Sequence, residues 1–156
     1  MRLRRLRIAE LADAAALCMR SKAVWGYDKA FMAACRDELA LSPEELEESF
    51  VIVAEENGTF RGVGQLVVSD DTCELEKLFV EPAAMGRRVG RLMFEALRDE
   101  AVRKGANRML VTADPDAVPF YKRMGFRECG HEPSGSIPGR TLPVLALDLA
   151  GQPAAG

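Results

Sequence analysis

Residues 78–92 read LFVEPAAMGRRVGRL and predict a strand, a tight turn and a helix in that order. The apolar residues 78–80 are typical of a buried strand, and Pro82 stops it because proline offers no N–H to a sheet. Gly86 and Gly90 then enclose two arginines, and the apolar residues that follow recur at helical spacing. Because the first turn of a helix has free N–H groups and the positive end of the helix dipole, this arrangement predicts an anion-binding site.

The glycine spacing indicates which kind of anion site this is. The turn lacks the glycine-rich run followed by Lys and Ser or Thr that defines a P-loop, and it does not fit the dinucleotide pattern G-x-G-x-x-G. It resembles the acetyl-coenzyme A loop of the GNAT (GCN5-related) N-acetyltransferases, which reads roughly V-x-P-x-x-R/Q-G-x-G-x-G. The matching residues are Val80, Pro82, Gly86 and Gly90. Met85 replaces the usual Arg or Gln, and Arg88 replaces the middle Gly. Ordinary strand-to-helix turn chemistry is the alternative for this stretch alone.

A second motif at residues 114–126, DPDAVPFYKRMGF, supports the resemblance. The GNAT counterpart reads N-x-x-A-x-x-F-Y-x-x-x-G-F. The matching residues are Ala117, Phe120, Tyr121, Gly125 and Phe126, and Asp114 stands where Asn is common. Two motifs in the family order are stronger evidence than either alone, and the resemblance extends over residues 2–149.

Length and composition indicate one globular domain. A chain of 156 residues with 48% hydrophobic and 29% charged residues can bury a core without metals or disulfides. We expect one domain over residues 1–150 and a flexible tail over residues 151–156. The net charge of -3 argues against nucleic acid or anionic membranes as partners, and no apolar run is long enough for a membrane span.

Cysteine and histidine usage argues against a metal site and against disulfides. The four cysteines are spread widely without a C-x-x-C pair, and the chain has a single histidine. We therefore expect no metal ligand set, and reduced, mostly buried cysteines in a cytoplasmic protein.

Hydrophobic periodicity and turn residues place the elements. Strands are expected at residues 3–8, 50–55, 59–69, 73–80, 109–113, from 126 onward and at 141–149. Helices are expected at residues 10–19, at 21–39 with a break near Gly26, at 44–49 and from about 87 to 104. Tight turns at 57–58 and 70–71 make the middle strands an antiparallel meander, and the helical crossover to 109–113 predicts a parallel pair. The resemblance implies the GNAT fold, an α/β (α+β) architecture whose mixed, mostly antiparallel central sheet has about seven strands and helices on both faces.

The resemblance implies transfer of an acetyl group from acetyl-coenzyme A to a primary amine by direct attack. This chemistry requires a base for the amine, polarisation of the thioester carbonyl and an acid for the departing thiolate. The family assigns the acid role to the position of Tyr121, whose alternative role is to anchor its helix. Glu74 is the first candidate base and Glu76 the second, and a strand without a bulge places both on one face with Leu78 and Val80. A water chain in place of a carboxylate base is the alternative.

The resemblance also assigns the binding residues. The backbone of Leu78, Phe79 and Val80 is expected to pair with pantetheine, and Asp114 to hydrogen-bond to it. The N–H groups and arginines of the turn are expected to hold the pyrophosphate, through Gly86, Arg87, Arg88, Val89, Gly90 and Arg91. The candidates for contact with the acceptor, a small-molecule or protein amine, are Trp25, Asp28, Asp37 and the loop at residues 134–140.

Two alternatives stay open at this point. The first is a non-catalytic acyl-coenzyme A-binding or interaction module on the same fold, because fold does not guarantee activity. The second is a homodimer that pairs through the last strand, which is compatible with either function.

Overall fold

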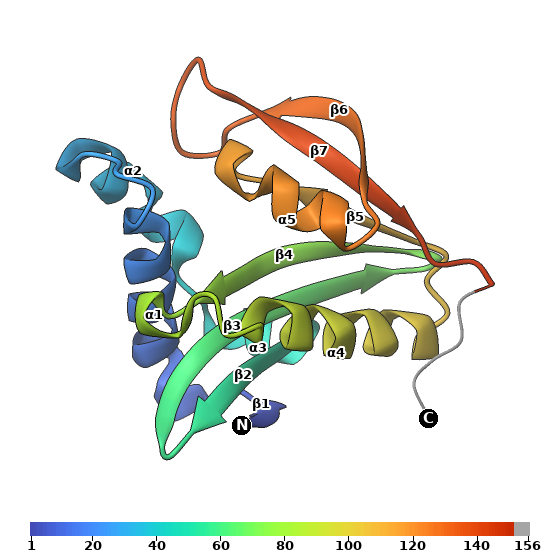
Figure 1. The fold of residues 1–156 in the computed structure, drawn as a ribbon, viewed down its shortest axis with the longest axis horizontal. Coiled ribbons are helices and arrows are strands. Elements are labelled where there is room, and N and C mark those ends of the chain that lie inside the picture. Colours follow the sequence, from blue (N-terminus) through green and yellow to red (C-terminus); the bar gives the residue numbers. More distant parts are fainter. Residues whose placement is uncertain (152–156) are drawn as a thin grey trace.

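The structure is a computed structural model, and it describes residues 1–151. All but the first residue of the predicted tail at 151–156 lies outside the described residues. The described chain forms one seven-stranded sheet in the order β1-β2-β3-β4-β5-β7-β6 (Figure 1). The strands are β1 (Arg2–Arg5), β2 (Phe50–Glu56), β3 (Thr59–Ser69), β4 (Thr72–Val80), β5 (Arg108–Thr112), β6 (Arg127–Pro133) and β7 (Thr141–Asp148).

The helices account for most of the remaining chain. The α-helices are α1 (Leu11–Ala23), α2 (Lys29–Leu39), α3 (Pro43–Glu48), α4 (Val89–Arg103) and α5 (Val118–Arg123). Short 3₁₀ turns occur at η1 (Ile8–Glu10), η2 (Pro82–Ala84) and η3 (Pro115–Ala117). Ser42 caps α3, and its side chain accepts a hydrogen bond from the Glu45 N–H at 3.2 Å. No helix within residues 1–151 has both the length and the hydropathy needed to cross a membrane.

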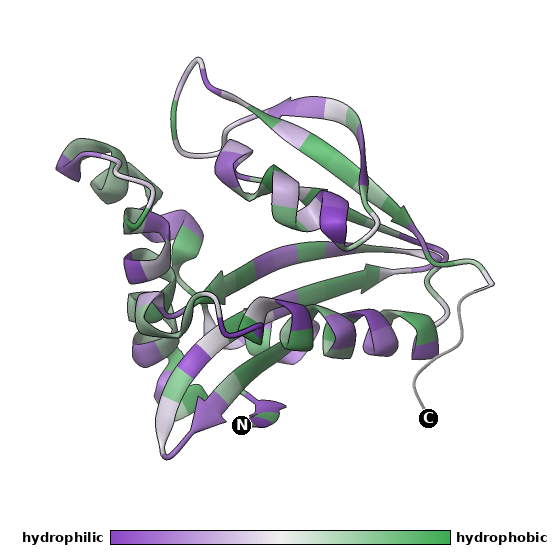
Figure 2. Ribbon diagram, in the orientation of Figure 1, coloured by the Kyte–Doolittle hydropathy of each residue, from purple (hydrophilic) through white to green (hydrophobic). Residues whose placement is uncertain are grey.

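Two hydrophobic clusters cover the two faces of the sheet. One is formed with α4 and α5 and contains Met93, Phe94, Leu97 and Tyr121. The other is formed with α1, α2 and α3 and contains Leu17, Cys35 and, at its margin, Leu46. Hydrophilic and hydrophobic residues alternate along α4, as expected for a helix with one buried side (Figure 2). The mixed sheet with helices on both faces is therefore confirmed.

Two glycines let α4 lie close to β3. A Cβ on Gly64 would stand 2.8 Å from Leu97 Cδ1, and a Cβ on Gly62 would overlap Met93 Sδ. The absence of side chains at these positions brings the helix, and the turn before it, against the middle of the sheet.

The first strand differs from its prediction. β1 ends at Arg5, and Ile8, which was expected on the buried face of a longer strand, is 66% exposed. The Glu10 carboxylate accepts a hydrogen bond from the Arg7 N–H at 2.9 Å, and this local turn bends the chain into η1.

The sheet is narrowly joined at its centre. β4 and β5 are parallel, as predicted, but among the described residues they pair only over Thr72–Glu74 with Arg108–Leu110. β4 continues to Val80 on the β3 side, whereas β5 pairs along its length with β7. The two strands therefore separate beyond Glu74, and a cleft opens between them.

The position of β7 corrects the predicted dimer contact. β7 is the last strand in sequence, but it lies between β5 and β6 and pairs with both. A partner cannot add to a strand whose two edges are already paired, so the expected homodimer contact through the last strand is wrong. The free edge on this side of the sheet belongs to β6, whose residues are all exposed.

Candidate active site

A cleft of about 990 Å³ follows the separation of β4 from β5. Its floor and walls come from five parts of the chain: β4, the turn into α4, the end of β5 with α5, the segment from α1 to α2, and the loop between β6 and β7. Both parallel strands end at this edge of the sheet, which is where α/β proteins place their ligands.

The N-terminus of α4 faces this cleft without a cap. Its N-cap residue, Arg88, makes no side-chain capping bond, so the first-turn N–H groups lack partners from the helix itself. The cleft-lining residues of this turn are Met85, Gly86, Arg88, Val89, Gly90 and Arg91. Free N–H groups, a helix dipole and two arginines together favour a phosphate group.

Arg88 takes a left-handed backbone conformation that favours glycine, at the position where the family pattern has one. Its φ is 65°, in the left-handed region, which costs an L-residue about 1–2 kcal/mol. Gly86 before it has a φ of 83°. The turn therefore has the shape of a glycine-rich loop although one of its glycines is an arginine.

Arg87 does not belong to the cleft. Its guanidinium donates to Glu56 Oε1 and Oε2 at 3.1 and 2.9 Å, at the end of β2. This ion pair lowers the pKa of Glu56. Arg87 thus ties the turn to the sheet instead of lining the cleft.

A bulge in β4 places the two candidate glutamates. Leu66 of β3 pairs with Leu75 and Gln65 pairs with Lys77, so Glu76 is an extra residue in the strand. Cys73 and Leu75 before the bulge, and Leu78 and Val80 after it, all pack in the α4-side cluster. Glu74 therefore lies on the opposite face, and the expectation that it shares a face with Leu78 and Val80 is wrong.

Glu76 lines the cleft, whereas Glu74 does not. Water reaches Glu76, but the surrounding protein removes part of its hydration and raises the pKa of its carboxyl to about 7. Hydrogen bonding and charge from Glu74 raise this pKa further, while Lys77 opposes them. A carboxylate poised near neutral pH is suited to accept a proton from an amine.

Lys77, next to Glu76, is a cation held inside the fold. Its side chain is 8% exposed, and its Nζ donates to Gln65 Oε1 at 3.1 Å. Gln65 in turn donates to Glu45 Oε2 at 2.9 Å and to Ser49 Oγ at 3.1 Å. This series of hydrogen bonds from α3 through Gln65 therefore holds the positive charge of Lys77 next to the bulge.

Tyr121 of α5 is buried and also lines the cleft. Its ring packs edge-on against Phe120 and Phe126, at centroid distances of 5.2 and 5.4 Å. Burial raises the pKa of its hydroxyl well above the ordinary value. Tyr121 is therefore protonated at neutral pH, as an acid for a departing thiolate must be.

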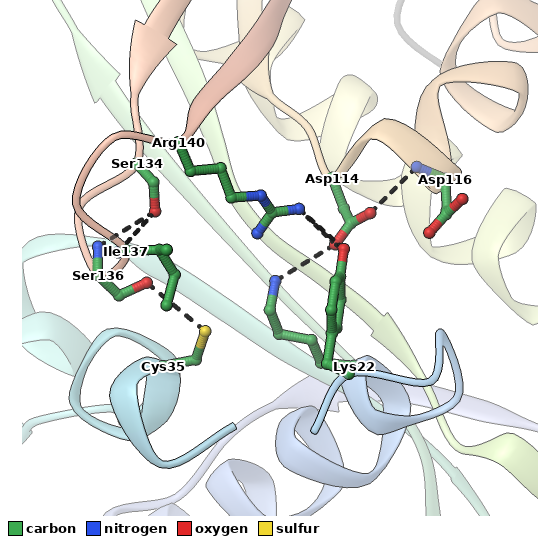
Figure 3. A network of polar contacts seen from close by, with 9 residues as sticks. Lys22, Cys35, Asp114, Asp116, Ser134, Ser136, Ile137 and Arg140 are labelled. Carbon is green, nitrogen blue, oxygen red and sulfur yellow. Dashed lines mark hydrogen bonds and ion pairs between the residues drawn. The ribbon is translucent and has the colours of Figure 1, made fainter. Parts of the chain in front are cut away.

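Asp114 follows β5 and is surrounded by partners from the other wall of the cleft. Asp114 Oδ2 accepts from the Tyr27 hydroxyl at 2.7 Å and from Lys22 Nζ at 3.4 Å, and Arg140 NH2 lies 3.7 Å away (Figure 3). The Asp114 Oδ1 atom accepts from the Asp116 N–H at 3.0 Å and so caps η3. Asp114, Lys22 and Arg140 all line the cleft.

Trp25 and Asp28, both predicted to contact the acceptor, have different positions. Trp25 lines the cleft and is 44% exposed. Asp28 does not line it: its carboxylate accepts from the Phe31 N–H at 2.8 Å and caps α2. The sequence contains the signal for this second role, since an Asp just before a helical pattern is a typical N-cap.

The cleft brings together most of the residues singled out from sequence. Those that line it are Trp25, Glu76, Leu78, Phe79, Val80, Gly86, Arg88, Val89, Gly90, Arg91, Asp114 and Tyr121. Asp28, Glu74 and Arg87 do not. Sequence reasoning missed Lys22 and Lys77, and the only available signal was that Lys77 stands where the alternation of Cys73 and Leu75 predicts another apolar residue. In residues 1–151 no group of His, Cys, Asp and Glu is arranged to hold a metal ion.

Comparison with known proteins identifies the family. The family described as "Acetyltransferase (GNAT) domain" matches residues 17–135, which is most of the chain. The chain therefore belongs to the GNAT acetyltransferase family. It is 29% identical over 84 residues to an IAA acetyltransferase of Azospirillum brasilense, covering 51% of this chain and 55% of that protein. It is 34% identical over 85 residues to the uncharacterized N-acetyltransferase YjcF of Bacillus subtilis, covering 54% of this chain and 61% of that protein. These matches span little more than half the length of the curated relatives.

Solved structures share the fold. A GCN5-related N-acetyltransferase structure from Rhodopseudomonas palustris superposes with a TM-score of 0.78 at 22% identity, covering 94% of each chain. The PaiA N-acetyltransferase of Thermoplasma acidophilum, solved in complex with coenzyme A, gives a TM-score of 0.75 at 16% identity, covering 94% of this chain and 98% of that one.

Proposed function

We propose that this protein transfers an acetyl group from acetyl-coenzyme A to a primary amine by direct attack. The observation that carries this proposal is the meeting of three groups in one cleft: the uncapped N-terminus of α4, the Glu76 carboxyl with its raised pKa, and the protonated Tyr121. Family membership supports it, as do relatives named acetyltransferases and a fold relative solved with coenzyme A.

The residues present fit the co-substrate. The N–H groups of residues 88–91 and the side chains of Arg88 and Arg91 would hold its pyrophosphate. The exposed edge of β4 at residues 78–80, which β5 leaves unpaired, would pair with its pantetheine arm. Acetyl-coenzyme A supplies a thioester whose carbonyl carbon accepts the amine.

Two side chains move the protons in this proposal. Glu76, ionised above its pKa of about 7, takes one proton from the acceptor ammonium and leaves its lone pair free to form the new C–N bond. The Tyr121 hydroxyl gives a proton to sulfur as the C–S bond breaks. The nitrogen loses its second proton as it becomes an amide, and this proton restores the Tyr121 hydroxyl. Lys77 beside Glu76 favours its ionised form.

The four cysteines fit a reducing compartment, for which the cytoplasm is our proposal. None of them is in a disulfide: Cys18, Cys35 and Cys73 are buried and Cys129 is exposed.

The test measures thiol release from acetyl-coenzyme A with a panel of primary amines, alongside thermal shift with acetyl-coenzyme A, coenzyme A and NAD. The proposal expects amine-dependent release of thiol and a rise in Tm with acetyl-coenzyme A but not with NAD. A rise in Tm without turnover of any amine, in wild type and at every pH from 6 to 9, would instead support the non-catalytic acyl-coenzyme A-binding module.

A further inference from the structure

A charged cluster closes the acceptor side of the cleft. We call Lys22, Tyr27, Asp114 and Arg140 the Asp114 cluster. Its members come from α1, the α1–α2 segment, the end of β5 and the β6–β7 loop, and in Figure 3 Lys22 and Arg140 both point toward Asp114. The Lys22, Asp114 and Arg140 side chains are 15%, 12% and 20% exposed, so water screens their charges only weakly.

The cluster has more positive than negative charge. Lys22 and Arg140 share one carboxylate, and burial raises the pKa of the Tyr27 hydroxyl to about 12, so Tyr27 is neutral. The enclosed Arg4 has the opposite balance, since it lies 2.7 Å from both Glu10 and Glu55. Among the described residues, Asp114 is the only carboxylate that pairs with Lys22 or Arg140, which leaves one positive charge without a counter-ion.

Both cations keep N–H donors that no group within residues 1–151 uses. A guanidinium has five N–H donors, and Arg140 has one hydrogen bond, from NH2 to the Tyr27 hydroxyl at 2.8 Å. The ammonium of Lys22 has three, and its one bond, to Asp114, is long at 3.4 Å. Both lie over the stacked rings of Tyr27 and Phe31, whose centroids are 3.9 Å apart, and these rings orient them without neutralising them.

The cluster lies apart from the phosphate-binding turn. Its residues belong to α1, the α1–α2 segment, the end of β5 and the β6–β7 loop, whereas the free N–H groups belong to α4. The β6–β7 loop also contacts α2, where Cys35 Sγ lies 3.5 Å from Ser136 Oγ. The β6–β7 loop therefore contacts both Tyr27 and α2 and closes this end of the cleft. A closed end suits a small molecule better than a polypeptide.

We propose that the Asp114 cluster is the subsite for a carboxylate of the acceptor, and that the acceptor is a small amino acid-like molecule with both an amine and a carboxylate. This inference rests on the proposed acetyl transfer for the role of the amine. Glu76 receives the amine, and the unused donors of Lys22 and Arg140 receive the carboxylate, which supplies the missing negative charge.

The first experiment separates binding from chemistry. Tm is measured for wild type and Arg140→Gln with 3-phenylpropionate and with 3-phenylpropanamide, each with and without coenzyme A. The proposal expects wild type to bind the acid at least about tenfold more tightly than the amide, and the variant to lose this preference. Equal binding of acid and amide, or no binding of either, overturns the carboxylate subsite whether or not the protein acetylates amines.

The second experiment tests the acceptor class. Acetylation of a set of L-amino acids is compared with that of their carboxamides, at saturating acetyl-coenzyme A. The proposal expects kcat/KM to favour the acids by about tenfold to a hundredfold, and Arg140→Gln or Lys22→Gln to raise the acceptor KM by a similar factor. Lys122→Gln is the matched control, since it removes an exposed cation on α5 that does not line the cleft.

Asp114→Asn should change the preference for acids over carboxamides in the direction opposite to Arg140→Gln. Asn keeps an oxygen for the η3 cap but removes the only negative charge of the cluster, so preference for the acids should increase. A rise in the KM for acetyl-coenzyme A with unchanged acceptor KM, in Arg140→Gln and Lys22→Gln, would assign the cluster to the co-substrate and overturn the proposal. Efficient acetylation of peptide amines that lack a nearby carboxylate would overturn it as well.

Discussion

Glu74 and Glu76 face different surroundings although one residue separates them, and Glu74 acts on the pKa of its neighbour. The bulge at Glu76 puts that side chain in the cleft, where burial first and Glu74 second raise the pKa of its carboxyl to about 7. Glu74 thus raises the pKa of Glu76 without lining the cleft itself.

Replacing Glu74 should move the pH dependence of turnover. Glu76 must be ionised to accept a proton, so kcat/KM should fall as pH decreases through about 7. Glu74→Gln removes a neighbouring negative charge and lowers the pKa of Glu76, so the fall in kcat/KM should move toward lower pH. Glu76→Gln should abolish this fall in kcat/KM near pH 7 and reduce kcat by about a hundredfold or more. An unchanged profile in Glu74→Gln would contradict the coupling of the two carboxyls.

The same raised pKa predicts a stability effect. Because the folded protein binds this proton more tightly than the unfolded chain, the contribution of Glu76 to stability is full below its ordinary pKa of 4.5 and is lost as pH rises through about 7. Glu76→Gln should therefore stabilise the protein at pH 8 relative to wild type, by about 1 kcal/mol once solvent screening of this exposed side chain is included. Urea unfolding at pH 5 and pH 8 measures it, and an effect equal at both pH values would exclude this cause.

Tyr121→Phe should separate chemistry from folding. The Tyr121 hydroxyl has no hydrogen bond within the described residues, and Phe keeps the ring contacts with Phe120 and Phe126. We expect kcat to fall by about a hundredfold while Tm and the affinity for acetyl-coenzyme A stay near wild type. An unchanged kcat would assign Tyr121 a packing role only.

The arginines of the turn should differ in their effect on co-substrate binding. Arg91 lines the cleft and, within residues 1–151, pairs only with the exposed Glu95 at 3.1 Å, whereas Arg87 is bound to Glu56. Arg91→Gln should weaken acetyl-coenzyme A binding several-fold, more at low salt than at high salt. Arg87→Gln should leave it unchanged. Calorimetry at two salt concentrations measures the affinity of both variants for acetyl-coenzyme A. Equal losses of affinity would mean that Arg87 leaves Glu56 when the ligand binds.

Gly64 should not tolerate a side chain. A Cβ there would stand 2.8 Å from Leu97 Cδ1, so Gly64→Ala should push α4 away from β3 and destabilise the fold by about 1–3 kcal/mol. Gly130→Ala is a matched control, because a Cβ at Gly130 meets nothing within 4 Å. Urea unfolding compares the two, and equal stability would mean that Leu97 simply rotates away.

The fold and the turn that precedes α4 were predictable because their signals are local. Residues 57–58 form the expected turn with positive φ at both positions, and α4 ends just before Gly105, which has a φ of 86°. Periodicity and turn chemistry act over a few residues, so they can be read from the chain.

The acidic and cationic groups of the cleft were less predictable because distant contacts place them. The bulge at Glu76 depends on register with β3, and period-two alternation without it put Glu74 on the wrong face. Lys22 and Arg140 meet Asp114 from positions 92 and 26 residues away in sequence. No local pattern encodes such a contact, and a polar residue at the end of a helix looks the same whether it meets solvent or a carboxylate.

The three-residue junction between β4 and β5 has a consequence for cooperativity. Within residues 1–151, strand pairing between the two halves of the sheet is limited to Thr72–Glu74, and the Asn107 N–H donates to the Asp71 carbonyl beside it. An extended ligand that bonds to the free edges of both strands would work as an eighth strand inside the sheet. Binding of such a ligand would link two half-sheets that otherwise communicate mainly through side-chain packing. The hydrogen-exchange rates of backbone amides on both halves would then fall together.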